Sequence, residues 1–135
     1  KDYKTNSDRD ANNGSTVLKL AYGNKSFLFT GDIEKEAEYL LLSKSNDLKC
    51  TVLKVPHHGS LTSSSIAFLD KARPDKAVFS VGYRNQFGFP KEPITKRYKD
   101  VGASTYRTDR EGAIIASTDV ARARFIRTLN HALSR

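Results

Sequence analysis

Short apolar segments that alternate with helix-forming segments are the sequence feature that most restricts what this chain can fold into. Six apolar segments have the composition and pattern of strands: 16–22, 26–30, 50–55, 77–81, 104–107 and 113–116. The helix-forming segments between them cover 34–43, a stretch from Ser63 or Ser64 to Asp70, and 94–100. This alternation predicts a layered α/β fold in which a mixed sheet has flanking helices.

The two ends of the chain differ in composition from this middle part. Residues 1–14 are polar and rich in turn-forming residues, so we expect a flexible lead-in there. Residues 120–135 are basic, and apolar residues recur at every third position from 120 to 132, which predicts a basic C-terminal helix. At 135 residues, the chain has the length of one domain or a large piece of one.

Positive charge is concentrated in the second half of the sequence. Of the net charge of +8, residues 84–135 contribute +6 and residues 1–83 contribute +2. Such a surface favours an anionic partner such as nucleic acid, although many soluble proteins are simply rich in Lys and Arg. The longest apolar stretches have four or five residues, far short of the roughly 20 that span a membrane. Cys50 is the only cysteine, which excludes an intrachain disulfide and a thiolate metal cluster.

Three residues that suit metal binding follow the ends of predicted strands. Asp32 comes after the second strand, and His57 and His58 come after Pro56, which ends the third. Imidazole and carboxylate are common zinc ligands, and open α/β sheets place ligands at the carboxyl ends of strands. Adjacent side chains in extended backbone point in opposite directions, so we expect one histidine to face a metal and the other to be packed or hydrogen-bonded.

Simpler roles remain open for the same residues. Aspartate is a frequent N-cap, so Asp32 can instead cap the helix predicted at 34–43. The segment 57–60 can be a polar loop that leads into the next helix. A zinc site also needs three or four protein ligands, and the sequence has neither an H-x-H-x-D-H nor an H-E-x-x-H segment. The third histidine, His131, falls in the predicted C-terminal helix.

Several short motifs occur in order along the chain, and together they are more specific than any one alone. They are Asn13-x-Ser15, Phe27-Leu-Phe-Thr-Gly31-Asp32, Leu53-Lys-Val-Pro-His57-His58-Gly59-Ser60, Pro74, Ser80-Val-Gly82, Asn85-x-x-Gly88-x-Pro90 and Tyr106-Arg-Thr-Asp109-x-x-Gly112. From about residue 12 to residue 118, the chain resembles the C-terminal half of the metallo-β-lactamase-like domain of ComEC-type DNA-uptake proteins and their stand-alone relatives.

This resemblance implies a fold and a metal site. The fold would be the C-terminal half of an αββα sandwich, and Asp32 would match a metal-ligand aspartate that often bridges two metals. His57 and His58 match a His-His-Gly-Ser motif at the edge of the metal cleft, as metal ligand and as catalytic or substrate contact. A divalent metal, zinc or manganese, would activate water for hydrolysis, often of phosphodiesters.

The same resemblance implies nucleic acid as the substrate, and in ComEC-type proteins it implies degradation of the DNA strand that is not imported. The expected phosphate contacts are Ser60, Arg84, Asn85 and Arg107. The planar fork of arginine suits phosphate oxygens, and the basic second half of the chain would steer DNA toward them.

Two departures from the family pattern bear on activity. The main metal motif of the family, H-x-H-x-D-H, belongs to the N-terminal half and is absent from this chain. Phe89 stands where relatives have the histidine of Gly-His-Pro, and a phenyl ring neither ligates a metal nor transfers a proton. Because the first residue is Lys1 and not Met, we expect a longer protein that contains the missing half.

Partners and location follow from the family interpretation. A half sandwich exposes an apolar sheet face, and we expect the missing N-terminal half, the C-terminal helix or a second copy in a homodimer to cover it. DNA is the expected ligand, and a ComEC-type chain would be a soluble domain of a channel protein in the bacterial inner membrane. The alternatives are a cytoplasmic stand-alone hydrolase with a small-molecule substrate and a non-catalytic DNA-binding or structural module.

Overall fold

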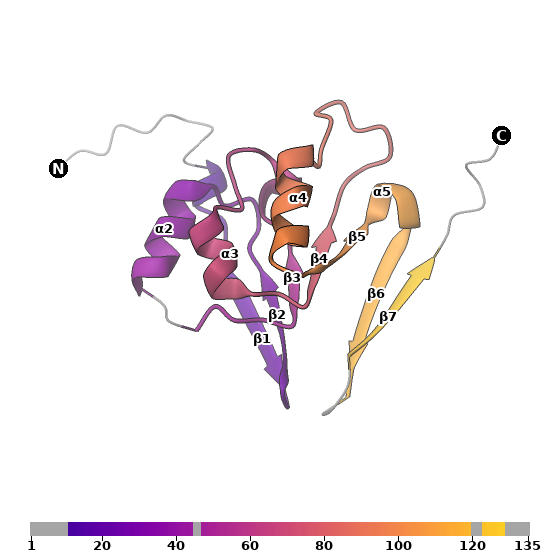
Figure 1. The fold of residues 1–135 in the computed structure, drawn as a ribbon, viewed down its shortest axis with the longest axis horizontal. Coiled ribbons are helices and arrows are strands. Elements are labelled where there is room, and N and C mark those ends of the chain that lie inside the picture. Colours follow the sequence, from indigo (N-terminus) through magenta and orange to yellow (C-terminus); the bar gives the residue numbers. More distant parts are fainter. Residues whose placement is uncertain (1–10, 45–46, 120–122, 129–135) are drawn as a thin grey trace.

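The computed structural model describes residues 11–44, 47–119 and 123–128, which form a five-stranded sheet, a two-stranded hairpin and several helices (Figure 1). The sheet has the order β1-β2-β3-β4-β5, with β1 (Leu18–Tyr22), β2 (Lys25–Phe29), β3 (Val52–Lys54), β4 (Lys76–Phe79) and β5 (Ser104–Arg107). β1 is antiparallel to β2, and β2 to β5 are parallel to one another. The predicted mixed α/β fold is confirmed.

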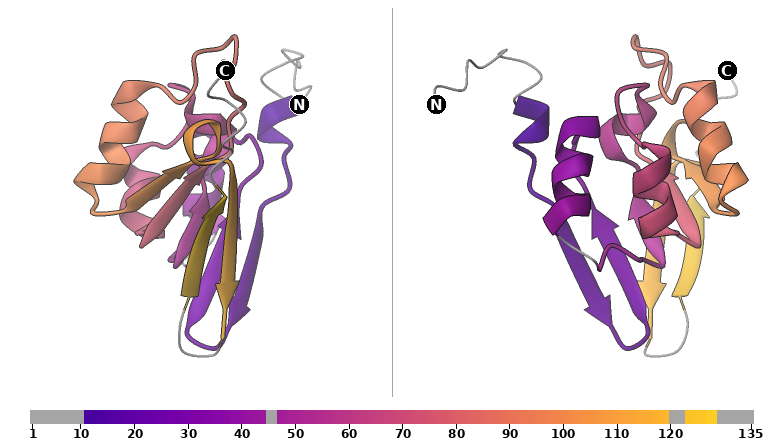
Figure 2. Two further views of the ribbon diagram at one scale, coloured as in Figure 1. Left: turned by 90° about the vertical axis from the view of Figure 1, so that its right-hand side faces the viewer. Right: turned by 60° about the vertical axis from the view of Figure 1, so that its left-hand side comes forward.

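Helices connect the parallel strands and cover one face of the sheet (Figures 1 and 2). They are α2 (Lys35–Lys44), α3 (Ile66–Ala72) and α4 (Glu92–Asp100), with a 3-10 turn η1 (Pro56–Gly59) after β3 and a short helix α5 (Thr108–Glu111) after β5. α3 begins at the N-cap Ser65, whose Oγ accepts from the backbone N–H of Phe68 at 3.3 Å, one or two residues later than predicted.

The hydrophobic core lies between these helices and the sheet. Phe68 on α3 and Tyr98 on α4 are fully buried against Phe79 of β4, and the rings of Phe79 and Tyr98 meet edge to face at 5.3 Å. Burying a side chain of this size stabilises the fold by about 1.5–3 kcal/mol. This core fixes the strand ends from which the polar loops of the candidate site extend.

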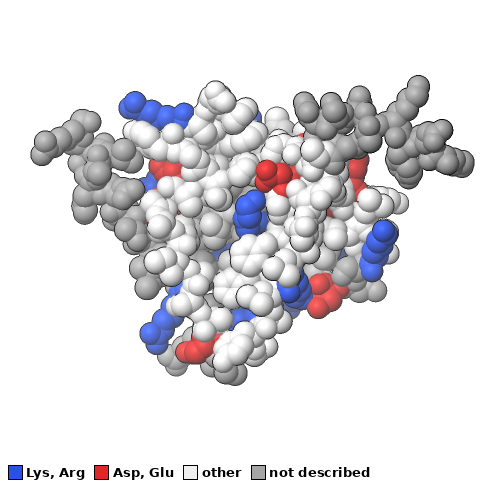
Figure 3. All heavy atoms as spheres, turned by 180° about the vertical axis from the view of Figure 1, so that it is seen from behind, with Lys and Arg blue, Asp and Glu red and all other residues white. Residues whose placement is uncertain are grey.

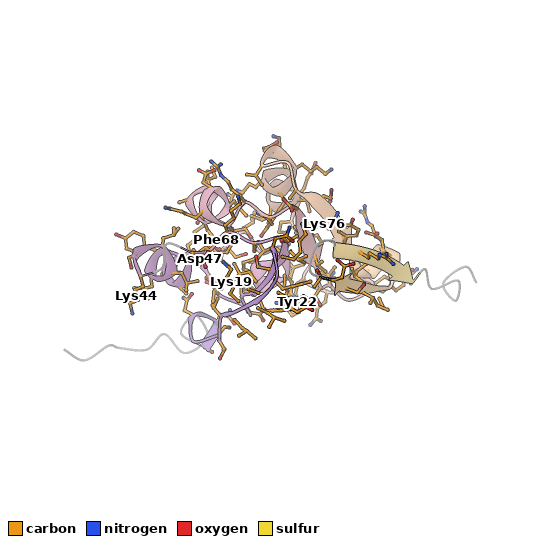
Figure 4. The ribbon with its side chains drawn as sticks, turned by 90° about the horizontal axis from the view of Figure 1, so that it is seen from below. Lys19, Tyr22, Lys44, Asp47, Phe68 and Lys76 are labelled. Carbon is orange, nitrogen blue, oxygen red and sulfur yellow. The ribbon has the colours of Figure 1, made fainter. Side chains whose placement is uncertain are left out.

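The opposite face of the sheet is largely apolar and partly open. Leu18, Leu20 and Tyr22 of β1 point to this face, and each is more than half exposed. Lys19 points to the helix side, where its Nζ pairs with Asp47 at 2.6 Å (Figure 4). Figure 3, which views the molecule from this open side, shows mostly uncharged side chains with charged ones scattered among them.

A hairpin of β6 (Ala113–Thr118) and β7 (Ala123–Thr128) lies on the open face (Figure 2). Ile114 and Ala116 of β6 line a hollow of about 380 Å³ together with Phe27 and Val78 of the sheet. The hairpin therefore covers part of the apolar face and leaves β1 exposed on this side.

The predicted C-terminal helix is wrong for residues 123–128, which form β7. Six consecutive residue pairs join β7 to β6, and its sequence contains Phe, Ile and Thr, which favour strands. The helix prediction rested on apolar residues at every third position. That spacing takes no account of the hydrogen bonds that β7 forms with the adjacent strand β6. The rest of the predicted helix, 120–122 and 129–135 with His131, lies outside the described residues.

The last residues of the predicted lead-in form local structure. Residues 11–13 form a helical turn that is hydrogen-bonded to the segment before α2, whereas residues 1–10 lie outside the described part. Among the helices of residues 11–44, 47–119 and 123–128, none combines the length and the apolar character required to cross a bilayer.

Candidate functional site

The candidate site lies at the carboxyl edge of the parallel strands. Asp32 follows β2, the histidine turn η1 follows β3, and the loop 82–90 follows β4. His58 and Asn85 line one hollow of about 200 Å³ at this edge, and His58 also approaches Asp32. The sheet thus brings together segments from three separate parts of the chain, as the strand order requires.

His58 has one ring nitrogen hydrogen-bonded to the backbone and the other directed toward Asp32. Its Nδ1 lies 2.6 Å from the carbonyl oxygen of Ser80, and a carbonyl only accepts hydrogen bonds, so Nδ1 carries a proton. In the neutral imidazole, Nε2 is then unprotonated, and it lies 3.5 Å from Oδ2 of Asp32. A backbone carbonyl that fixes the tautomer in this way is typical of metal-ligating histidines.

Asp32 is held by a lysine that the sequence did not single out. Nζ of Lys54 lies 3.4 Å from Oδ1 of Asp32 and also donates to the carbonyl oxygen of Gly31 at 3.0 Å. The backbone N–H of Asp32 donates to Oγ of Ser15. The carboxylate is therefore fixed at the end of β2, with Oδ2 directed toward His58.

The N-cap role that the sequence left open for Asp32 belongs to Asn13. Oδ1 of Asn13 accepts from the backbone N–H groups of Glu34, at 2.9 Å, and Ala37, at 3.3 Å, at the start of α2. The carboxylate of Asp32 contacts Lys54 and His58 instead. This leaves Asp32 available for the site.

His57 is anchored by hydrogen bonds and lies beside Phe89. Its Nδ1 is 3.1 Å from Oε1 of Glu34 and 3.3 Å from Oγ1 of Thr62, and its ring meets Phe89 edge to face at 5.8 Å. Glu34 is buried and also accepts from Nδ2 of Asn12. His58 therefore faces Asp32 and His57 faces Glu34, but the extended backbone on which the sequence prediction relied is absent, because both histidines have positive φ.

Glu34 is a site residue that the sequence reasoning missed. It lies two positions after Asp32, and a second carboxylate so close to the first was the available signal. Its contact with His57 depends on the backbone of η1, where both histidines have positive φ, 45° for His57 and 55° for His58. Such conformations cost non-glycine residues about 1–3 kcal/mol each and concentrate at functional sites.

The predicted phosphate contacts occupy different places. Ser60 is buried, and its Oγ bonds to Oγ1 of Thr62 at 3.0 Å. Asn85 closes the loop 82–90 by accepting from N–H of Phe89 and donating to its carbonyl, both at 2.8 Å. Arg84 is exposed on this loop.

Arg107, by contrast, lines a larger hollow of about 610 Å³ beside α4, where Asp109 pairs with its guanidinium at 2.6 and 3.0 Å. Phe89 separates the two hollows, because its ring lines both of them. It stacks on Phe87 at 5.7 Å and contacts His57. Phe89, the position for which the resemblance implied a histidine, is thus an apolar residue shared by the hollow of His58 and the basic hollow.

A group of buried polar side chains lies between α2, α3 and α4 and is linked by hydrogen bonds. Both carboxylate oxygens of Glu38 accept backbone N–H groups, from Ser64 and Ser65, and Oγ of Ser64 contacts the hydroxyl of Tyr98 at 3.0 Å. Burial raises the pKa of Glu38 and that of Tyr98 above their ordinary values. Burial also raises the pKa of the Cys50 thiol to about 12, so this thiol stays protonated at neutral pH.

The donor set fits half of a metal site. Asp32 and His58 offer an oxygen and a nitrogen donor, a combination that suits zinc or manganese. Within the described residues, no group of three or more His, Cys, Asp or Glu side chains is arranged to hold a metal ion. Zinc needs three or four protein ligands, so further ligands have to come from elsewhere.

A model of the Metallo-beta-lactamase superfamily matches residues 10–83 of this sequence, and the chain belongs to that superfamily. This match includes Asp32 and both histidines of η1. Members of the superfamily generally bind divalent metals.

Three relatives that match this chain carry names that refer to competence, the ComE operon or recombination. The chain is 40% identical over 106 residues to "Competence protein ComA" of Neisseria gonorrhoeae and 35% identical over 103 residues to "ComE operon protein 3" of Bacillus subtilis. It is 38% identical over 89 residues to "Recombination protein 2" of Haemophilus influenzae. The alignment with the Neisseria protein covers 78% of this chain and 15% of that relative, so the chain spans a small part of the length of the proteins it matches.

Proposed function

We propose that this chain supplies one side of a metal-dependent centre that hydrolyses phosphodiester bonds of nucleic acid during DNA uptake. The observation that carries the proposal is the orientation of His58, whose Nε2 faces Asp32 while Ser80 fixes the proton on Nδ1. Similarity to competence proteins supports the link to DNA uptake.

In this proposal, Asp32 and His58 hold a divalent metal, zinc or manganese, with ligands from outside the described residues. Such a metal, when bound, lowers the pKa of a water molecule and polarises a phosphate. Lys54 keeps the carboxylate of Asp32 in place, and Glu34 keeps the ring of His57 from rotating toward the cleft. His57 is then a positioning or substrate-contacting residue beside the cleft.

The assembly and location of the protein belong to the same proposal. The open apolar face carrying Leu18, Leu20 and Tyr22 is the surface on which the other half of the domain, or a second copy, would pack. We propose that the chain is a soluble domain of a longer protein of the bacterial inner membrane whose channel portion admits DNA. The relatives support this proposal because one is named a competence protein and both are much longer than this chain.

A non-catalytic nucleic-acid-binding module is the second candidate function. Phe89 favours it, because the resemblance implies a histidine at this position, and the phenyl ring beside His57 supplies neither a metal ligand nor a proton. The two candidates differ in one property: the hydrolase needs the metal, and the binding module does not.

Metal content and nuclease activity together test the proposal. Protein extended at its N-terminus by about one domain half should carry near-stoichiometric zinc or manganese, by elemental mass spectrometry, and should cleave a labelled oligonucleotide. Asp32→Ala should abolish both, whereas Asp70→Ala, an exposed aspartate on α3, should change neither. Absence of metal in the extended wild-type protein would refute the hydrolase, and nucleic-acid binding that persists would support the second candidate.

A further inference from the structure

Exposed aromatic side chains gather on the loop 82–90, beside the candidate site. Phe87 is 62% exposed and Tyr83 is 51% exposed. The ring of Phe87 stacks on Phe89 at 5.7 Å with an interplanar angle of 20°, so its second face is the outward one. Large aromatic rings presented in this way on a polar loop favour a ligand that can cover them.

The loop presents these rings on a firm backbone. Asn85 bonds across it to both backbone groups of Phe89, and the N–H of Gly88 donates to the carbonyl oxygen of Asn85. Lys91 ties down its end, through its N–H to the carbonyl oxygen of Gly59 at 3.0 Å and through Nζ to the carbonyl oxygen of Phe87 at 2.7 Å. The aromatic surface is therefore preorganised for binding.

A basic hollow adjoins Phe89, the ring on which Phe87 stacks. Its volume is about 610 Å³, and Lys99, Arg107 and Arg110 line it together with Glu92. The guanidinium of Arg107 is paired with Asp109, so three cations meet two carboxylates here. The hydroxyl-bearing residue Thr105 also lines it. An excess of positive charge with hydroxyl groups suits phosphate oxygens.

The basic hollow and the candidate metal site share a wall. Phe89 lines this hollow on one side and the smaller hollow of His58 on the other. A chain of phosphates that occupies the basic hollow and continues past Phe87 would thus be led toward His58. The pairing of Asp32 with His58 involves neither the exposed aromatic rings nor Lys99 and Arg110.

We propose that the loop 82–90 and the basic hollow form a binding site for single-stranded nucleic acid, with bases stacked on Phe87 and Tyr83 and phosphates at Lys99, Arg107 and Arg110. The inference rests on the proposed function for what happens at His58, but the binding itself needs no metal. Paired bases in a duplex are already stacked on one another, so exposed rings select single strands.

Fluorescence anisotropy with a labelled single-stranded oligonucleotide of about 12 nucleotides, in EDTA to prevent hydrolysis, tests the site. Phe87→Ala should weaken binding about fivefold or more, and Phe87→Trp should restore it. Lys99→Ala should reduce the slope of log Kd against log salt by about 0.7. The matched controls are Tyr39→Ala, an aromatic on α2 that is 72% exposed, and Lys71→Ala on α3, and both should leave the affinity unchanged.

Three results would overturn the inference: unchanged affinity in Phe87→Ala, an equal loss in Tyr39→Ala, or equally tight binding of the duplex of the same sequence. Binding of anionic lipid vesicles that depends on Phe87, without oligonucleotide binding, would also overturn it. If Phe87→Ala weakens oligonucleotide binding in EDTA but the wild-type protein does not cleave the oligonucleotide when metal is added, only the proposed hydrolase fails. If the protein cleaves the oligonucleotide and Phe87→Ala changes neither binding nor cleavage, only this inference fails.

Discussion

Replacing Gly59 with alanine tests how closely the histidine turn packs against the loop 82–90. Gly59 has φ +85°, and an added Cβ would lie 2.6 Å from Cβ of Pro90 and 3.0 Å from the ring of Phe79. Gly102 offers a matched control, because its φ is +82° and nothing lies within 4 Å of its added Cβ. The two substitutions share the backbone cost and differ in the steric overlap.

The magnitude follows from these two terms. A left-handed conformation costs a residue with a Cβ about 1–2 kcal/mol, and forcing an extra carbon into a packed site costs about 1–3 kcal/mol. Gly102→Ala should therefore lower the free energy of unfolding by about 1–2 kcal/mol, and Gly59→Ala by about 2–5 kcal/mol. Equilibrium urea unfolding followed by circular dichroism measures both values.

The overlap at Gly59 should also disturb the site, because relief of the clash requires Pro90 to move away from η1 and the loop 82–90 to move with it. Equal losses of stability in Gly59→Ala and Gly102→Ala would refute the close approach of turn and loop.

Three further substitutions probe the supports of the site. Asn13→Ala removes the cap of α2 and should lower the free energy of unfolding by about 0.5–2 kcal/mol in urea, with no loss expected for a surface asparagine such as Asn24. Asn85→Ala removes two hydrogen bonds across the loop 82–90 and should speed amide exchange of Phe89 while α3 stays protected; unchanged exchange would contradict the clamp. Glu38 has a raised pKa, so the folded state holds its proton more tightly: stability from this group is full below about pH 4.5 and is lost as the pH rises through the raised value. Unfolding of Glu38→Gln in urea from pH 4 to 8 should lack this fall, and an identical pH profile in the wild-type protein would contradict it.

Most strands and helices could be predicted from the sequence because their apolar patterns match what the core buries. Two short apolar segments bounded by turn residues show this, namely Phe27 to Thr30 and Ala77 to Val81. The first overlaps β2 and the second overlaps β4. β7 could not be predicted, because its residues satisfy a helical spacing and only the pairing with β6 decides between the two structures.

The sequence predicted which residues form the candidate site but not which side chains they contact. Asp32 and the two histidines stand out because they follow strands, and their meeting at one edge follows from parallel strand order. The pairing of His57 with Glu34 depends on left-handed backbone at both histidines, which no local pattern indicates. The cap supplied by Asn13 comes from a residue 21 positions before Glu34, a separation that propensity arguments do not cover.

The metal-to-protein ratio of two single variants tests the central claim most directly. The claim is that His58 is a metal ligand and that His57 is held beside the site by Glu34. In protein extended at its N-terminus, elemental mass spectrometry should find the metal lost or strongly reduced in His58→Ala and largely retained in His57→Ala. Retention of the metal in His58→Ala together with its loss in His57→Ala would contradict the account.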